Sequence, residues 1–124
     1  MPINIISLNH ASFIVADIAI SREFYCEVLG LQQVERPDLG FPGVWIQIGE
    51  QQLHLLELQN PDPTTGRPQH GGRDRHVALN VLALTPIQDA LNKAGVVYTM
   101  SISGRRALFC RDPDGNTLEF IEQA

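Results

Sequence analysis

Lysine is nearly missing from this chain of 124 residues: Lys93 stands alone, and the 9 Lys and Arg residues are outnumbered by 14 Asp and Glu residues. Because a nucleic-acid-binding protein normally presents a basic face, the net charge of −5 argues against such a partner. No apolar run approaches the roughly 18 residues that a membrane helix needs. The N-terminus lacks the basic and long apolar regions of a signal peptide. We therefore expect a cytoplasmic protein that binds neither nucleic acid nor a membrane.

Cysteine is also scarce. Cys26 and Cys110 form neither a Cys-x-x-Cys pair nor the framework of a secreted disulfide protein, which suits a reducing compartment. The chain has no Gly-x-Ser-x-Gly, no P-loop and no Gly-x-Gly-x-x-Gly, so a hydrolase elbow and the common nucleotide-binding loops are excluded. What remains is an ordinary globular composition, with 44% hydrophobic and 19% charged residues, and a length typical of one domain.

The same order of elements is predicted in both halves of the chain. Asp17 is a helix N-cap candidate and Gly30 a helix stop, while Thr85 opens a capping box and Gly95 ends a second helix. The elements of the first half span 3–15, 18–29, 31–35, 44–48 and 52–58, with the helix in second place. Those of the second half span 76–82, 86–94, 96–101, 107–111 and 116–122, in the same order. Residues 59–75 are rich in proline and glycine and predict a connector.

We therefore predict an α+β protein with a single domain over residues 1–124. Two tandem βαβββ modules, 3–58 and 76–122, form a curved mixed sheet. The spacings match: 44 residues separate His10 from His54 (54 − 10), and 43 separate His76 from Glu119 (119 − 76). Each module exposes an apolar sheet face that it cannot bury alone, so two modules must pair within the chain or across a dimer. We expect a homodimer.

Four metal-binding side chains occupy equivalent places in the two modules: His10 and His76 on the first strands, His54 and Glu119 on the last. Since strand side chains alternate, His10, His76 and Glu119 project from the face without helices. A single strand histidine is more often packed than a ligand, and a lone glutamate usually faces solvent. Four such residues at equivalent positions favour one divalent metal ion per site (Zn, Ni, Fe, Co or Mn), provided that the sheet curls into a trough. His70, in the connector, is a weaker candidate for a ligand contact.

Five motifs along the chain match a known pattern. They are Leu8-Asn9-His10, Val15-Ala16-Asp17, Ser21-x-x-Phe24-Tyr25-x-x-Val28-Leu29-Gly30, His76-Val77-Ala78-Leu79-x-Val81 and Asp112-Pro113-Asp114-Gly115-Asn116-x-Leu118-Glu119. Together they resemble the vicinal oxygen chelate superfamily, which includes glyoxalase I, extradiol dioxygenases, fosfomycin-resistance thiol transferases and bleomycin-binding proteins. The resemblance implies the glyoxalase/bleomycin resistance/dioxygenase fold, metal ligands at His10, His54, His76 and Glu119, and a small substrate with vicinal oxygens. It also implies a site that often forms at a dimer interface.

The resemblance leaves three function classes open. The first is a metal-dependent lyase or isomerase of the lactoylglutathione-lyase type, with Glu119 as the candidate catalytic base and His54 as a ligand or proton shuttle. The second is a metal-dependent dioxygenase. The third is a small-molecule binding module of the antibiotic-resistance kind, which would leave the four ligands unexplained. Ile14 and Leu58 stand where the bacterial glyoxalase I pattern has arginine and asparagine, which argues against glutathione as part of the substrate.

Overall fold

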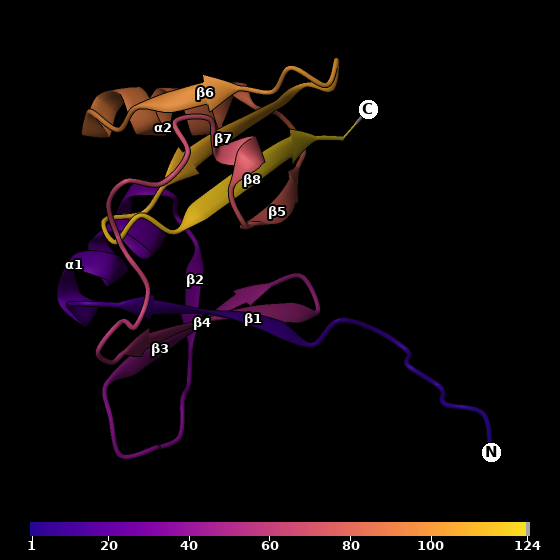
Figure 1. Ribbon diagram of the computed structural model, residues 1–124, viewed down its shortest axis with the longest axis vertical. Coiled ribbons are helices and arrows are strands. Elements are labelled where there is room, and N and C mark those ends of the chain that lie inside the picture. The colour runs from indigo at the N-terminus through magenta and orange to yellow at the C-terminus, as the bar shows by residue number, and fades with distance from the viewer. Residues whose placement is uncertain (124) are drawn as a thin grey trace.

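The chain folds into two four-stranded sheets, one from each half of the sequence (Figure 1), in a computed structural model that describes residues 1–123. The first half comprises β1 (His10–Val15), α1 (Ile18–Arg22), the π-helix η1 (Glu23–Val28), β2 (Gln32–Val34), β3 (Gly43–Ile48) and β4 (Gln51–Glu57). The second comprises the short 3₁₀ helix η2 (Gly71–Arg73), β5 (His76–Val81), α2 (Thr85–Ala94), β6 (Tyr98–Met100), β7 (Ala107–Arg111) and β8 (Thr117–Glu122). The strand orders are equivalent, β1-β4-β3-β2 and β5-β8-β7-β6. In each sheet the first and last strands of the module run parallel and the other pairs antiparallel. The α+β class and the two mixed βαβββ modules are thus confirmed, and their strands lie in two sheets rather than one.

The start of each helix is held in an equivalent way. A glutamate near the end of each module's last strand accepts a backbone N–H at the beginning of the helix: Glu57 Oε1 from Ile18 at 2.9 Å, and Glu122 Oε1 from Leu84 at 3.0 Å. Asp17 adds the predicted N-cap, since its Oδ1 accepts from the N–H groups of Ala19 and Ile20. Acidic groups at a helix N-terminus satisfy free N–H donors and oppose the helix dipole.

Three local predictions were wrong. The first strand begins at His10 rather than Ile3, because β4 supplies pairing partners only for His10–Val15; residues 1–9 lie outside any strand and lead away from the body (Figure 1). The first helix is not uniformly α-helical, because it changes to a π-helix at Glu23. Thr85 does not cap the second helix: Leu84 occupies the N-cap with helical dihedral angles, and its own side chain makes no cap hydrogen bond.

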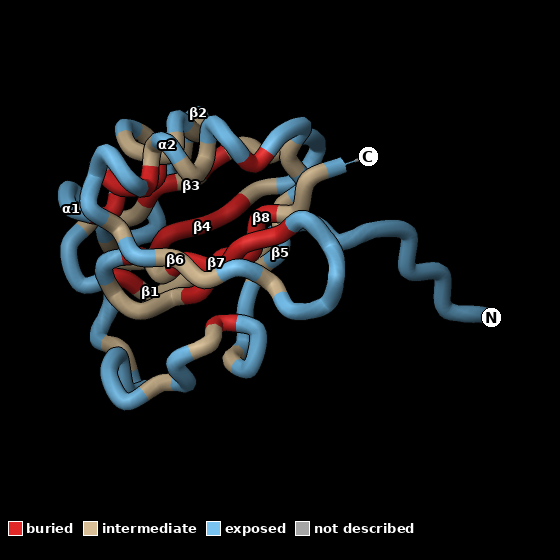
Figure 2. Tube along the Cα trace, turned by 90° about the horizontal axis from the view of Figure 1, so that it is seen from above, coloured by how far each residue is buried: buried red, intermediate tan, exposed pale blue. Residues whose placement is uncertain are grey.

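The core lies between the helices and the inward faces of both sheets. It contains Val15, Leu55, Leu91, Leu118 and Phe120, each at most 1% exposed, and the buried tracks of β4 and β8 run through the middle of the molecule (Figure 2).

Polar bonds join the two modules at the turn between β7 and β8. The Tyr25 hydroxyl donates to Asp112 Oδ2 at 2.8 Å, and the Asn116 side chain donates to the Ile14 carbonyl at 3.1 Å. Burial raises the pKa of both Tyr25 and Asp112, and the carboxylate beside the phenol raises that of Tyr25 further. These contacts fix how the sheets sit relative to one another.

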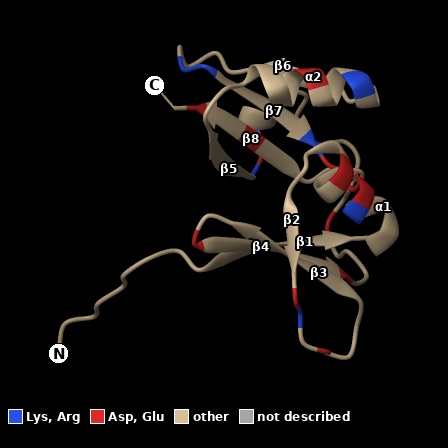
Figure 3. Ribbon diagram, turned by 180° about the vertical axis from the view of Figure 1, so that it is seen from behind, with Lys and Arg blue, Asp and Glu red and all other residues tan. Residues whose placement is uncertain are grey.

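Charge on the surface is mixed. In Figure 3 the Lys and Arg residues are scattered over both modules among acidic residues, and they do not gather along one face. Within residues 1–123, none of the helices has the length and apolar character needed to cross a bilayer. The two cysteines are free thiols, and burial raises the pKa of Cys110 to about 12.

Candidate metal centre

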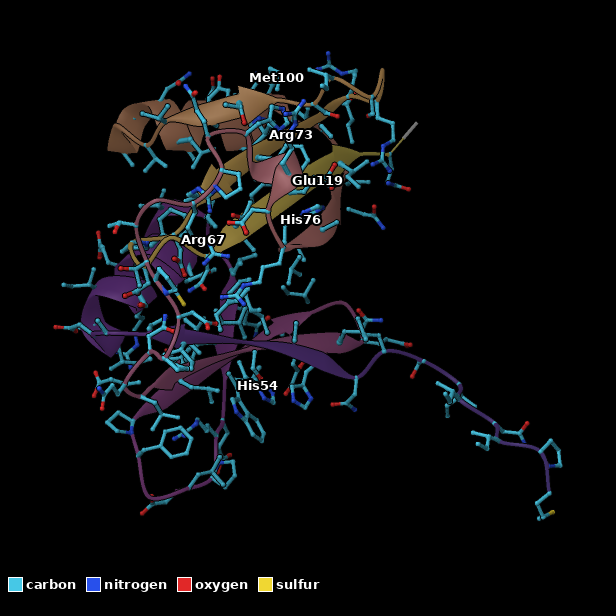
Figure 4. All side chains as sticks on the ribbon, viewed as in Figure 1. His54, Arg67, Arg73, His76, Met100 and Glu119 are labelled. Atoms are coloured by element: carbon cyan, nitrogen blue, oxygen red, sulfur yellow. The ribbon has the colours of Figure 1, made fainter. Side chains whose placement is uncertain are left out.

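The four predicted ligands lie in two pairs rather than in one cluster. His10 and His54 lie side by side on neighbouring strands of the first sheet, and the His76 and Glu119 side chains meet on the second. Within residues 1–123, no three His, Cys, Asp or Glu side chains lie close enough to hold one metal ion. In Figure 4, His54 projects from the side of the first sheet that faces away from His76 and Glu119. A single chain therefore presents two half-sets of donors.

The first pair belongs to a stack of three rings. Trp45 lies directly opposite His54 in the β3–β4 register, and their ring centroids are 4.3 Å apart; the His10 ring lies 4.0 Å from His54 on the other side. His54 Nε2 lies 2.8 Å from Gln52 Oε1, which can only accept, so the ring donates there and Nδ1 keeps its lone pair. His10 likewise donates from Nδ1 to Asn9 Oδ1 at 2.7 Å, which leaves Nε2 free.

The electrostatic setting keeps His54 neutral. Burial lowers its pKa, and the neighbouring His10 and Arg36 lower it further. A metal binds only the deprotonated imidazole nitrogen, so this environment favours the form that can act as a ligand. The two ring planes are nearly parallel, at 20° and with centroids 4.0 Å apart, whereas a metal ion lies in the plane of each imidazole that binds it. The exposed His10 must therefore turn before both histidines can reach one ion.

The second pair is better prepared for a cation. His76 Nδ1 lies 2.8 Å from the backbone carbonyl of Asp74 and donates to it, so in the neutral ring Nε2 is the nitrogen that carries the lone pair. This Nε2 lies 3.3 Å from Oε1 of Glu119. The Glu119 side chain is only 3% exposed, and its Oε2 is buried without a hydrogen-bond partner, with the Arg105 guanidinium 3.6 Å away. A buried carboxylate oxygen without a partner is costly, and a divalent ion between Glu119 and His76 would satisfy it.

The connector is fixed to the second sheet beside this pair. The Asp74 carboxylate accepts from Nε and Nη2 of Arg67 at 2.6 and 2.7 Å and from Nη1 of Arg111 at 2.8 Å. These hydrogen bonds, that from Arg67 first, hold the pKa of Asp74 well below its usual range. Arg111 also donates to the hydroxyl of Thr117 at 2.6 Å. We call Arg67, Asp74 and Arg111 the connector clamp. Through the Asp74 carbonyl, it sets which nitrogen of His76 is free.

Residues 70–73, which lie between Arg67 and Asp74 in the sequence, cover the sheet face on which Glu119 lies. η2 packs against β7 and β8, and Gly71 comes so close that a Cβ there would lie 2.7 Å from the Thr117 side chain. His70 lies over Phe109 with ring centroids 5.3 Å apart, and both its nitrogens are engaged, Nδ1 by the Gly72 N–H and Nε2 by the Met100 carbonyl. His70 is therefore part of the cover. A cavity of about 330 Å³ opens beside His76, with Ser12 and Ile14 of β1 on its opposite wall.

Sequence reasoning found the four donors but missed their supports. Neither Arg111 nor Asp74 was among the predicted site residues. The clamp joins residues up to 44 positions apart (111 − 67), and neither periodicity nor spacing signals such a contact. A single hint exists in the sequence: Asp74 lies two residues before a candidate ligand, at the end of a long connector.

Comparisons with known proteins show which family and which relatives this chain is similar to. The family model of the Glyoxalase/Bleomycin resistance protein/Dioxygenase superfamily matches residues 7–120. Glyoxylase I 4 of Arabidopsis thaliana is 27% identical over 124 residues, which covers 95% of this chain and 71% of that protein. The uncharacterised protein YaeR of Escherichia coli strain K12 is 28% identical, with coverage of 94% and 95%.

Solved structures share the fold. A Bacillus anthracis protein described as a glyoxalase family member superimposes with a TM-score of 0.83 at 24% identity, with complete coverage of both chains. The fosfomycin resistance protein FosX of Listeria monocytogenes superimposes with a TM-score of 0.77 at 15% identity, over 98% of this chain and 94% of that one. A variant of FosX has been crystallised with Mn(II) and 1S,2S-dihydroxypropylphosphonic acid.

Proposed function

Since this chain belongs to the Glyoxalase/Bleomycin resistance protein/Dioxygenase superfamily, we propose that it is a divalent-metal-dependent lyase or isomerase that acts on a small substrate with vicinal oxygens. The observation that carries the proposal is the position of His76 Nε2, 3.3 Å from Oε1 of Glu119, whose buried Oε2 makes no hydrogen bond within residues 1–123. His10, His54, His76 and Glu119 are the proposed ligands, and Zn, Ni, Fe, Co and Mn suit this donor set. The Mn(II) in a FosX structure lends support from the same fold.

We further propose that the protein is a homodimer in which each site combines the two half-sets from different chains. β1 and β5 are edge strands of their sheets, and each begins with one ligand, His10 or His76. An edge strand has free backbone groups that can pair with another strand. A second copy that meets these edges brings His10 and His54 of one chain to His76 and Glu119 of the other. Residues 1–124 act as a single domain, in which the connector 59–75 joins the two modules.

The proposed chemistry is proton abstraction. A divalent ion in this site would act as a Lewis acid on a substrate oxygen and so acidify the neighbouring C–H group. Glu119 takes that proton, since it is the one carboxylate among the four ligands and has an oxygen without a hydrogen-bond partner. His54 keeps its ring proton on Nε2, toward Gln52, so its Nδ1 is free to hold the ion, and Glu119 itself can return the proton. η2 and His70 keep bulk water from the carboxylate, which keeps the abstracted proton at the site.

Metal analysis of the purified protein tests the ligand set. We expect wild type and His70→Ala to bind one ion per chain, while His10→Ala and His76→Ala lose most of it. His70→Ala is the matched control, because both ring nitrogens of His70 already have partners. Trp45 gives a second readout, since it is the one tryptophan of the chain and lies 4.3 Å from His54. Metal loss in His70→Ala, with retention in His76→Ala, would refute the assignment.

Mixing two inactive variants tests the shared site. One chain carries His10→Ala and His54→Ala, the other His76→Ala and Glu119→Gln. If sites are shared, mixed dimers contain one intact site, and random exchange restores metal to about one quarter of the wild-type content per chain. If each site lies within one chain, no mixture regains metal.

Deuterium exchange separates the function classes. We expect exchange at the α-carbon of an α-hydroxy thioester or hemithioacetal panel, and we expect Glu119→Gln to lose it mainly through kcat while keeping much of the metal. Oxygen consumption with Fe(II) and a diol, without α-proton exchange, would identify a dioxygenase instead. A metal-free protein that binds small molecules unchanged would identify a binding module.

A further inference from the structure

The Arg36 side chain is held by close contacts on the same face of the first sheet as His54. Gly43 and Trp45 alternate with the buried Val44 on β3, so both face the side where Trp45 stacks on His54. The Arg36 guanidinium fills the space of the missing Gly43 side chain: a Cβ there would lie 2.7 Å from its Cζ and Nε. The Phe41 ring covers it, with its centroid 4.9 Å from Cζ. The cation thus has a defined position rather than free rotation in solvent.

Two of its donors have no partner. Nε and Nη2 are buried and make no hydrogen bond within residues 1–123, and Arg36 forms no ion pair there either. These two nitrogens lie on one edge of the guanidinium, where their parallel N–H groups match the two oxygens of a carboxylate or phosphoryl group. A buried donor without a partner is costly, because its hydrogen bonds to water are lost and not replaced. This edge therefore has the form of an oxyanion receptor.

The receptor lies near a proposed ligand. Gly43, whose side-chain space the guanidinium fills, lies two residues before Trp45 on the same face of β3, and Trp45 stacks on His54 with ring centroids 4.3 Å apart. Other arginines differ, because Arg67, Arg75 and Arg106 all have a carboxylate partner.

We propose that Arg36 binds an anionic group of the substrate, a carboxylate or a phosphoryl-type group, through Nε and Nη2. The substrate then carries an oxyanion in addition to its vicinal oxygens. This inference rests on the proposed function, since it places the anion beside the site that includes His54. A carboxylate side chain of the second copy is the competing source of the same chemistry, and the experiment separates the two.

The test compares catechol with 2,3- and 3,4-dihydroxybenzoate, which add a carboxylate to the same vicinal oxygens. Trp45 fluorescence is followed in Mn-loaded and in metal-free protein. The ¹⁵N–¹H signal of Arg36 Nε is followed in Zn-loaded and in metal-free protein, because Zn replaces Mn in the NMR samples. We expect at least one dihydroxybenzoate to bind wild type about 10- to 100-fold more tightly than catechol, as a charged hydrogen-bonded pair implies. The preference should vanish in Arg36→Gln and shrink in Arg36→Lys, which keeps the charge but loses the paired donors. Arg22→Gln, an exposed arginine bonded only to Gln33, should behave as wild type.

The outcomes are distinct. Equal affinities in wild type, or a preference retained by Arg36→Gln, would overturn the proposal. An Arg36 Nε–H signal already shifted downfield without ligand, and altered by dilution of the protein, would assign the group to a partner carboxylate and also overturn it. If the protein takes up no metal, the proposed function fails by itself. The metal-free arm with 4-hydroxybenzoate still decides about Arg36, because the Nε–H signal must move with this anion and not with phenol.

Discussion

Asp74→Asn should destabilise the protein and disturb the site together. The Asp74 carboxylate accepts three side-chain hydrogen bonds from two arginines. Asparagine has only one acceptor oxygen, so its NH₂ group would face N–H donors of a guanidinium where Asp74 has its second oxygen. A hydrogen bond to a charged group contributes about 1.5–3 kcal/mol net. The side chains of Arg67 and Arg111 are 18% and 27% exposed, and Arg111 keeps its bonds to Thr117 and Gly115. The loss should therefore lie well below the sum of three such hydrogen bonds. We expect a loss of about 2–4 kcal/mol.

Urea denaturation of wild type and variant measures this loss, with the slope checked for two-state behaviour. Asp62→Asn is the matched control: its partner Arg75 is equally close at 2.6 Å, but the two side chains are 46% and 66% exposed, so its effect should stay below about 1 kcal/mol. Metal affinity should fall about 10- to 100-fold in Asp74→Asn alone, because His76 loses its fixed orientation. Equal effects of the two substitutions, on stability or on metal, would refute the role given to the connector clamp.

Three further predictions concern stability. Arg67 holds the pKa of Asp74 low in the folded state, so that carboxylate stabilises the fold above its unfolded pKa of about 4, and this contribution is lost as the pH falls. Between pH 6 and 2 the free energy of unfolding should therefore fall less steeply for Asp74→Asn than for wild type. Tyr25→Phe should cost about 1–2 kcal/mol in the same denaturation assay, because the hydroxyl is lost while Asp112 keeps its other donors; a neutral result would mean that this bond does not join the modules. Gly71→Ala should cost about 1–3 kcal/mol, since its Cβ would collide with side chains of β7 and β8. A thermal midpoint unchanged from wild type would contradict the close packing of η2.

Repeat spacing and glycine stops predicted the modules well because both are local or periodic signals. Gly95 ends α2 with φ of 71°, as its position suggested, and the alternation along β1 and β5 was read correctly. The extra strand length at Ile3 was wrong because β-branched residues signal strand propensity, whereas a strand also needs a neighbour. No sequence pattern reports that β4 pairs with β1 only from Gln52 onward.

The site was harder to derive. Alternation correctly put Glu119 and His76 on one face, yet it carries no information on how two sheets are oriented, so it left open whether the four donors meet within one chain or across a dimer. No sequence pattern indicated a role for Arg36. The position of its guanidinium depends on Phe41, in the following loop, and on Gly43, at the start of β3. Contacts of this kind arise from tertiary packing and leave no period in the sequence.

His54 and Glu119 occupy equivalent positions in the two modules but differ in charge. A divalent ion bound by three neutral imidazoles and one carboxylate keeps a net charge of +1 (2 − 1), whereas a second carboxylate in place of His54 would cancel it. Such a centre attracts anions by itself and lowers the pKa of any hydroxyl that binds to it further than a neutral centre would. Exchanging this one histidine for an acid would therefore change which substrate protonation state the site selects, without any change in the shape of the fold.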